Sequence, residues 1–127
     1  MGSVLPDGRP HVVPLWFVWL EDAVFVSCRQ GSRVWRNVAH DPRVALQFDR
    51  GRAWTELAGG LVHGQAETLV PEQPEARRPL SAWFEKYRGA LGGYGFTRYA
   101  EDVPQPGLLR VRPDRVVAWV HASKGPH

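Results

Sequence analysis

Apolar residues occupy both parities of one long stretch, residues 11–20. One parity carries Val13, Leu15, Phe17 and Trp19, and the other carries Val12, Pro14, Trp16 and Val18. A strand with one face in water would alternate with polar residues, so this pattern predicts a strand that is covered on both faces. In a chain of this size, one cover is a barrel interior, and we expect the other to be a second subunit. Pro14 has no N–H to donate, which predicts a bulge or a local break in the strand.

Further short apolar runs are separated by turns rich in glycine, proline and acidic residues. They predict a short segment at residues 1–5 and strands at residues 24–28, 43–49, 54–70, 108–112 and 115–120. The connecting turns are predicted at residues 6–9, 21–22, 49–52 and 113–114. Glycine bends the segment 54–70 as at a barrel corner. Together these elements predict a mainly β chain with one or two helices, folded as a small antiparallel barrel.

Two segments have the features of helices. Residues 75–91 place apolar side chains at spacings of three and four, and core packing explains this stripe fully. The stripe consists of Leu80, Trp83, Phe84, Tyr87 and Leu91. A shorter helix is predicted at Arg33–His40, because Ser32 stands in the N-cap position and the residue before Pro42 avoids the α region.

The short helix follows a strand and a glycine turn, and this arrangement forms a natural anion site. Free N–H groups and the positive end of the helix dipole point in the same direction. Arg29, Arg33 and Arg36 surround that point, and no Asp or Glu lies in residues 23–40. The pattern therefore predicts a pocket for a ligand phosphate. A basic helix exposed to solvent is the alternative interpretation, since charged runs usually lie on the surface.

Composition narrows the possible classes of protein. The 127 residues suit one domain, and the net charge of +3 comes almost entirely from arginine. Arginine suits bidentate phosphate recognition, although arginine-rich proteins are also typical of GC-rich genomes. Cys28 is the single cysteine, which excludes an intrachain disulfide and a cysteine zinc cluster, and we interpret it as a core residue. No apolar run approaches the roughly 20 residues of a membrane helix, and no signal peptide is visible, so the sequence indicates a cytoplasmic protein.

Other chemistries find little support in the sequence. The five histidines lack metal-ligand spacing, so no metal site is predicted. Ser27 and Ser32 lack the glycine setting of a hydrolase nucleophile. Six tryptophans and a basic surface are also features of a nucleic-acid-binding barrel, but the tryptophans follow strand and helix patterns that indicate core or interface positions. We therefore expect no nucleic-acid partner and no membrane partner.

Four segments in order resemble one known family over nearly the whole chain. They are PDGRPHVVPLWFVW, RQGSRVWRNVAHDPRVAL, LVHGQAE and LLRVRPDRVVAW. The chain resembles the pyridoxamine 5′-phosphate oxidase-like superfamily, the FMN-binding split barrels. Within it, the chain is most similar to the flavin/deazaflavin-dependent group associated with coenzyme F-420.

The resemblance implies a split β-barrel homodimer with two cofactor sites in the subunit interface. The cofactor is expected to be coenzyme F-420 or FMN. By resemblance, the backbone of Val13, Pro14, Leu15 and Trp16 lies along the flavin-type ring. The phosphate is expected to be held by Ser27, Arg29, Ser32, Arg33, Arg36 and Asn37.

Two departures from the family pattern stand out. Relatives commonly carry a lysine directly after the position of Arg33, where this chain has Val34. Relatives also begin with a helix and a fuller first strand, so the single domain, residues 1–127, is expected to lack that helix and part of that strand. Either departure is expected to weaken cofactor binding.

The expected function is hydride transfer at the cofactor ring, to or from an unidentified small molecule. No side chain in the sequence identifies itself as an acid or a base, so catalytic residues stay unassigned. A protein that binds or carries FMN or the deazaflavin without turnover is the alternative function.

Overall fold

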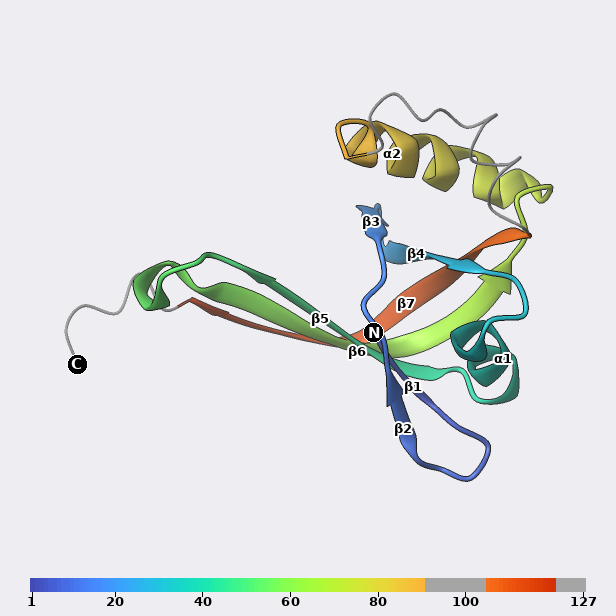
Figure 1. Cartoon of the computed structure of the whole chain (residues 1–127), viewed down its shortest axis with the longest axis horizontal. Coiled ribbons are helices and arrows are strands. Elements are labelled where there is room, and N and C mark those ends of the chain that lie inside the picture. Colours follow the sequence, from blue (N-terminus) through green and yellow to red (C-terminus); the bar gives the residue numbers. More distant parts are fainter. Residues whose placement is uncertain (91–104, 121–127) are drawn as a thin grey trace.

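The computed structural model describes residues 1–90 and 105–120, which form a strongly curved antiparallel sheet and two α-helices (Figure 1). The strands are β1 (Gly2–Val4), β2 (Pro10–Val12), β3 (Phe17–Leu20), β4 (Ala23–Arg29), β5 (Arg43–Arg50), β6 (Ala58–Leu69) and β7 (Pro106–Val120). The helices are α1 (Arg33–His40) and α2 (Arg77–Tyr87), with short 3-10 turns at Trp54–Glu56 and Pro74–Ala76. The seven strands follow the order β2-β1-β5-β6-β7-β4-β3.

Strand β4 is buried on both faces because a separate core packs on each. Val24, Val26 and Cys28 point into the larger core, which lies inside the curved sheet and is closed by Val34 and Val38 of α1. Ala23 and Phe25 point the opposite way, into a second core that α2 closes with Trp83. Successive side chains of β4 point to opposite faces of the sheet, so they pack into the two cores in turn. This explains why the β4 sequence is apolar at nearly every position.

The apolar stretch at residues 11–20 is not a single strand, so that prediction is wrong. Its first part lies in β2 and its last part in β3, and these strands are at opposite ends of the sheet. The chain between them runs past Pro14, which supplies no N–H for a ladder. The break expected at Pro14 is therefore present, and it is larger than a bulge.

The C-terminal segment is one strand, β7, where two strands were expected. Gly64 pairs with Pro113 and His63 pairs with Arg115, so Asp114 is left without a partner in the ladder. This is a β-bulge, which absorbs the extra residue and bends the strand without ending it. Gly64 is needed opposite the bulge, because a Cβ there would overlap the Arg112 carbonyl oxygen. The predicted 54–70 strand likewise starts later, since Trp54–Glu56 forms a 3-10 turn.

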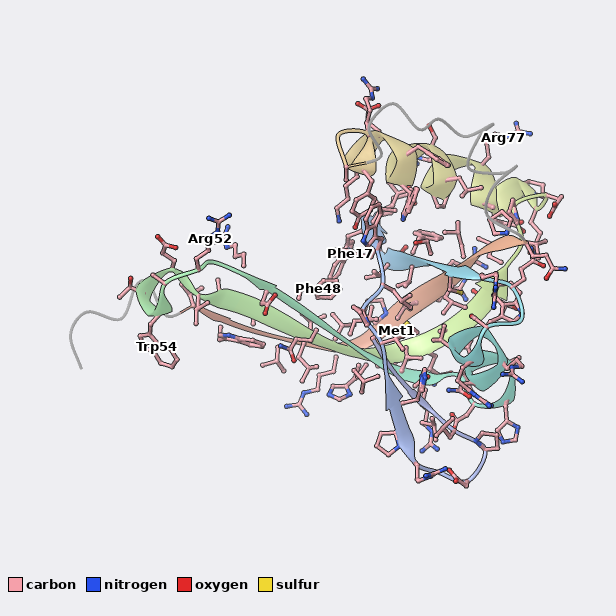
Figure 2. The ribbon with its side chains drawn as sticks, viewed as in Figure 1. Met1, Phe17, Phe48, Arg52, Trp54 and Arg77 are labelled. Carbon is pink, nitrogen blue, oxygen red and sulfur yellow. The ribbon has the colours of Figure 1, made fainter. Side chains whose placement is uncertain are left out.

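Beyond the bulge, β5, β6 and β7 continue as a narrow three-stranded arm that leaves the body of the molecule (Figures 1 and 2). We define the arm as residues 47–61 and 116–120. Its surface is unusually apolar: Val116 is 55%, Val117 40%, Val120 43% and Trp54 68% exposed. Exposed apolar surface of this kind marks an interaction site in a soluble protein.

An ion pair between neighbouring strands gives a stability prediction. Glu67 and Arg110 face each other directly across β6 and β7, with 2.6 Å between Oε1 and Nε. The Arg110 guanidinium lowers the pKa of the Glu67 carboxyl below its ordinary value. Because Glu67 is 45% exposed, solvent screens the pair. We expect Glu67→Gln to lower the free energy of unfolding at pH 7 by about 0.5–1 kcal/mol.

The pH dependence of this difference follows from the direction of the pKa shift. A carboxyl whose pKa is lowered by folding stabilises the protein above its unfolded-state pKa, and the stabilisation is lost as pH falls through the folded-state pKa. Urea unfolding of both proteins at pH 7 and pH 3 is the measurement. Glu72→Gln is the control, since Glu72 is exposed and makes no ion pair with a described residue. A wild-type advantage of equal size at both pH values would contradict the assignment.

Candidate functional site

The turn between β4 and α1 leaves the N-terminus of α1 suited to bind an anion. Gly31 has a φ of +80°, which reverses the chain without strain. Ser32 is the N-cap of α1, and its Oγ accepts from the Trp35 N–H at 3.4 Å. No described residue accepts from the N–H groups of Arg33 and Val34. These donors are therefore available to a bound anion, and the helix dipole favours negative charge at the same point.

A hollow of about 240 Å³ opens beside this turn. Its lining consists of His11, Val13, Leu15, Cys28, Arg29, Ser32, Arg33 and Val34. We call it the arginine pocket. Two guanidinium groups and no carboxylate line it, while its other walls are mainly apolar. It therefore suits a ligand with an anionic end attached to a larger apolar body.

The arginine pocket brings together half of the site residues expected from the sequence. Val13, Leu15, Arg29, Ser32 and Arg33 all line it. The other five expected residues lie outside its lining. Pro14 and Arg36 are exposed, Trp16 stacks on Tyr87 at 4.4 Å between ring centroids, and Ser27 donates from Oγ to the Trp16 carbonyl oxygen. Asn37 is buried.

Asn37 has a structural partner within the chain. Its side chain is 1% exposed, and Nδ2 donates to Ser3 Oγ at 3.1 Å, which joins α1 to β1. The Asn37 Oδ1 atom is also buried and has no hydrogen-bond partner. This hydrogen bond fixes how α1 packs on the sheet. It therefore also helps to position Arg33, which lies one helical turn before Asn37.

Three pocket residues were not predicted as site residues: His11, Cys28 and Val34. The parity of residues 11–15 could have indicated His11, because it alternates with Val13 and Leu15. Burial raises the pKa of the Cys28 thiol to about 11, and a hydrogen bond with Ser32 opposes this only in part. Cys28 therefore stays protonated at neutral pH and acts as a pocket wall, not as a nucleophile.

A second, smaller cavity of about 30 Å³ adjoins the arginine pocket, since both are lined by Leu15. Its other lining residues are Met1, Phe17, Val26, Leu46, Gln47 and Phe48. We call it the aromatic cavity. The rings of Phe17 and Phe48 meet edge to face at 4.6 Å, and Figure 2 shows both below α2. Leu15 thus lies between the pocket with the guanidinium groups and a pair of aromatic rings.

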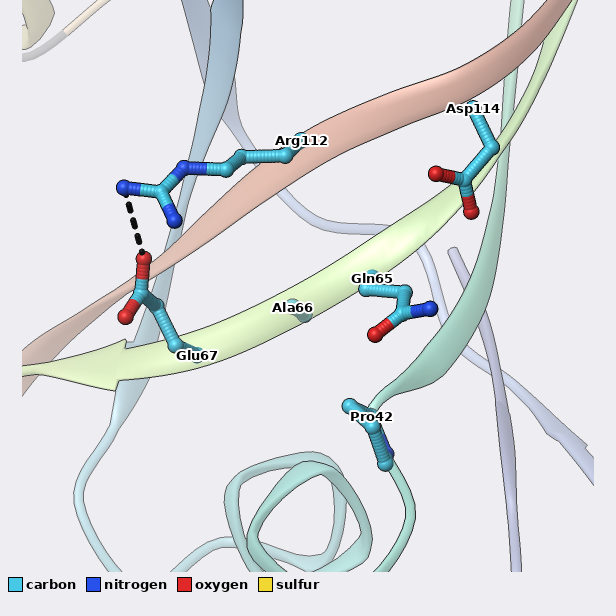
Figure 3. A pocket seen from close by; sticks show the side chains of 6 residues that line it. All are labelled: Pro42, Gln65, Ala66, Glu67, Arg112 and Asp114. Carbon is cyan, nitrogen blue, oxygen red and sulfur yellow. Dashed lines mark ion pairs between the residues drawn. The ribbon is translucent and has the colours of Figure 1, made fainter.

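A larger hollow, of about 490 Å³, lies elsewhere against β6 and β7 (Figure 3). It is lined by Pro42, Gln65, Ala66, Glu67, Arg112 and Asp114. The charges there have both signs, and Glu67 already pairs with Arg110 and Arg112. This hollow has no excess of positive charge, because the carboxylates of Glu67 and Asp114 outnumber the one guanidinium group, that of Arg112. The arginine pocket is therefore the better candidate site.

Among residues 1–90 and 105–120, no group of three or more His, Cys, Asp or Glu side chains is placed to hold a metal ion. No helix in the described part of the chain is long and apolar enough to cross a membrane.

Comparison with known proteins places this architecture. The family model described as pyridoxamine 5′-phosphate oxidase matches residues 1–120. The chain is similar to the conserved hypothetical protein Rv2991 from Mycobacterium tuberculosis, with 26% identity, a TM-score of 0.80, and 99% of this chain and 79% of that chain covered. No curated protein matches the chain.

Two further solved structures share the fold at lower identity. One is an F420 reductase, with 24% identity, a TM-score of 0.66, and coverage of 91% of this chain and 85% of that chain. The other is the heme storage protein HutZ from Vibrio cholerae, with 17% identity, a TM-score of 0.72, and coverage of 94% and 82%.

The family match confirms the resemblance found in the sequence. It spans both cores, the arginine pocket and the arm, and the curved seven-stranded sheet is the split barrel that the resemblance implied. The chain belongs to the pyridoxamine 5′-phosphate oxidase family.

Proposed function

We propose that this protein binds a flavin-type cofactor, FMN or the deazaflavin coenzyme F-420, with the cofactor phosphate in the arginine pocket. The observation that carries the proposal is a pocket with two kinds of wall. Arg29, Arg33 and two free N–H groups form its anion-binding part, and Val13, Leu15 and Val34 form an apolar part beside it. A phosphate joined to a flat heteroaromatic ring has the same two-part character.

Within residues 13–16, the main chain of Leu15 supports the placement of the ring, whereas the N–H and C=O groups of Val13 are already bonded to Met1. This segment lies in no strand, and the N–H and C=O groups of Leu15 have no described partner. Main-chain donors and acceptors left open beside an apolar wall suit a ring whose edge carries both kinds of group.

A second copy of the chain completes the site in this proposal. The arginine pocket offers about 240 Å³ in one chain, which is below the roughly 300–1,000 Å³ of pockets that enclose a ligand of this size. The apolar arm meanwhile needs a cover. We therefore propose a homodimer in which the arm of one protomer packs on the other and supplies the missing wall.

The proposed activity is oxidoreduction of a small molecule. When bound, the cofactor supplies hydride transfer, and the chain supplies position, electrostatics and exclusion of water. The described lining of the arginine pocket has no carboxylate, and its thiol stays protonated. The substrate class is therefore set by the part of the site that surrounds the ring. Binding or carriage of the cofactor without turnover is the second candidate function, because the described lining of the arginine pocket offers neither a carboxylate nor a reactive thiol.

The proposal is tested by identifying the ligand after purification under native conditions. We expect the protein to be yellow and to release FMN, or to fluoresce and release a deazaflavin. If the protein is colourless, titration with each cofactor at equal salt is the second measurement. We expect the deazaflavin to bind more tightly, because its acidic tail suits a chain of net charge +3. Failure of both cofactors to bind would overturn the proposed function.

A further inference from the structure

The last turn of α2 contacts the main chain of one residue, Phe17, at the start of β3. Tyr87 Oη accepts from the Phe17 N–H at 2.9 Å and donates to the Phe17 carbonyl oxygen at 2.8 Å. Lys86 Nζ donates to the same oxygen at 2.7 Å. Three hydrogen bonds from two consecutive side chains thus converge on one peptide position.

The sheet explains why these groups of Phe17 are open to the helix. β3 is an edge strand that pairs only with β4, and the Ser27 N–H donates to the Trp16 carbonyl oxygen. In an antiparallel pair, the next residue directs its N–H and C=O away from the partner strand. Phe17 therefore presents both groups at the sheet edge, where they would otherwise be unpaired.

Tyr87 alone satisfies the hydrogen-bonding groups of Phe17 at the sheet edge, because its hydroxyl bonds to both the N–H and the C=O group. Nor is Lys86 needed for the packing of α2, which depends on buried Trp83. Lys86 is itself exposed, and its ammonium lies 3.4 Å from the centroid of the Phe17 ring. A cation is thus fixed by a carbonyl oxygen and an aromatic face, with further N–H donors free to meet a ligand.

The position of this cation relative to the cavities gives it a role. Phe17 lines the aromatic cavity, which Leu15 joins to the arginine pocket. The guanidinium groups of Arg29 and Arg33 line the arginine pocket, and the Lys86 ammonium lies over the ring of Phe17, two residues along the chain from Leu15. Neighbouring Glu85 and Arg88 pair with each other, so they leave the Lys86 charge in place.

We propose that Lys86 is a positioning and charge-supplying residue for the ring end of the cofactor site, and that Tyr87 holds the Phe17 wall on which it acts. The inference rests on the proposed function. A hydride brings two electrons and one proton, so a ring that receives it becomes one charge more negative. A fixed ammonium nearby favours that reduced form over the oxidised form.

The first test measures the two-electron reduction potential of protein-bound FMN by reductive titration against a reference dye. Nearby charges shift ionisation equilibria by about one to three pKa units, so we expect Lys86→Met to disfavour the reduced form about tenfold. A tenfold change corresponds to about 30 mV toward lower potential. Lys86→Arg is expected to restore most of the shift, and Arg77→Met, which removes an exposed charge from the other end of α2, is expected to leave the potential unchanged.

The outcomes separate the two proposals. Bound FMN with the same potential in wild type, Lys86→Met and Arg77→Met would overturn the role of Lys86 and leave the proposed function standing. Equal shifts in Lys86→Met and Arg77→Met would also overturn it, because the effect would then come from net charge alone. Loss of FMN binding from the wild type would overturn both.

The second test concerns Tyr87, and it measures hydrogen exchange in the protein without cofactor and the dissociation rate of FMN from the loaded protein. We expect Tyr87→Phe to speed hydrogen exchange at the Phe17 amide by at least tenfold, since that N–H loses its acceptor, and to raise the dissociation rate of FMN. Exchange at amides of β6 serves as the internal reference for global stability. Faster exchange at Phe17 with an unchanged dissociation rate would show that Tyr87 only caps the strand, and would overturn its positioning role.

Discussion

Replacing Arg33 with alanine is expected to weaken FMN binding by about tenfold to a hundredfold. Arg33 lines the arginine pocket at the first residue of α1, beside the free N–H groups. A charge-assisted hydrogen bond to a phosphate contributes about 1.5–3 kcal/mol, and each 1.4 kcal/mol is about a factor of ten in affinity. Val34, the next residue, is apolar, so we expect Arg33 to bear more of the charge than it would beside a second cation.

The measurement is FMN affinity together with the melting temperature of each variant. The melting temperature is expected to change little, because exposed charges contribute little to stability. Arg36→Ala provides a graded comparison: Arg36 is exposed and lies outside the pocket lining, so its effect should be smaller than that of Arg33. Arg77→Ala on α2 is the control for net charge. If Arg33→Ala binds like the wild type, the phosphate is held elsewhere.

Placing charge on the arm is expected to convert a dimer into monomers. Val116 and Val120 lie four residues apart on β7, so they share one face of the arm, and both are exposed in the single chain. A double substitution, Val116→Glu and Val120→Glu, would bury two unpaired carboxylates in the proposed interface. Leaving such charges without partners costs several kcal/mol, so we expect the dimer dissociation constant to rise more than about a hundredfold.

Light scattering over a range of protein concentrations measures this change. Ser81→Glu is the matched control, since Ser81 is exposed on α2 and away from the arm. If a second copy completes the cofactor site, the double variant also loses FMN affinity, while Ser81→Glu retains it. A wild-type protein that is monomeric at micromolar concentration would contradict the homodimer, and so would a double variant that remains dimeric.

Local chemistry made much of the fold predictable from the sequence. Ser32, Gly31 and the Asp41-Pro42 pair define α1 within a few residues, and the structure confirms the helix at Arg33–His40. The hairpin turn at residues 21–22 is confirmed as well, with Glu21 at a φ of 58°. In each case the residues that indicate the structure lie within a few positions of it, so the prediction needs no contact that is distant in sequence.

The predictions that failed concern where a segment goes after an irregularity. Pro14 indicates a break, but only the sheet order shows that the chain then crosses from one edge to the other. Pro113 also indicates an interruption, yet β7 continues, because Gly64 on the neighbouring strand accommodates the bulge. A proline has the same local effect in both places. The outcome depends on a partner that is distant in sequence.

The part of the candidate site that depends on local sequence was predictable, and the part that depends on contacts distant in sequence was not. The sequence indicates which residues begin α1, and hence Ser32 and Arg33. It does not show what Asn37 contacts. Asn37 lies on the same face of α1 as the buried Val34 and Val38, so its side chain meets Ser3 in the interior while Arg36 stays on the surface. Residues 91–104 include Leu91 of the expected helical stripe, which lies outside the described residues.

The position of β7 in the sheet bears on how the chain assembles during synthesis. The hairpins β3–β4 and β5–β6 are each made of neighbouring segments, so they can form as soon as they leave the ribosome. The two hairpins cannot pair with each other directly, because β7 lies between β6 and β4 in the sheet and is synthesised last of the seven strands. Contacts between segments so far apart in sequence form slowly. Until β7 arrives, the two hairpins expose the apolar edges that it will bridge, which makes that interval the time of greatest exposure to aggregation.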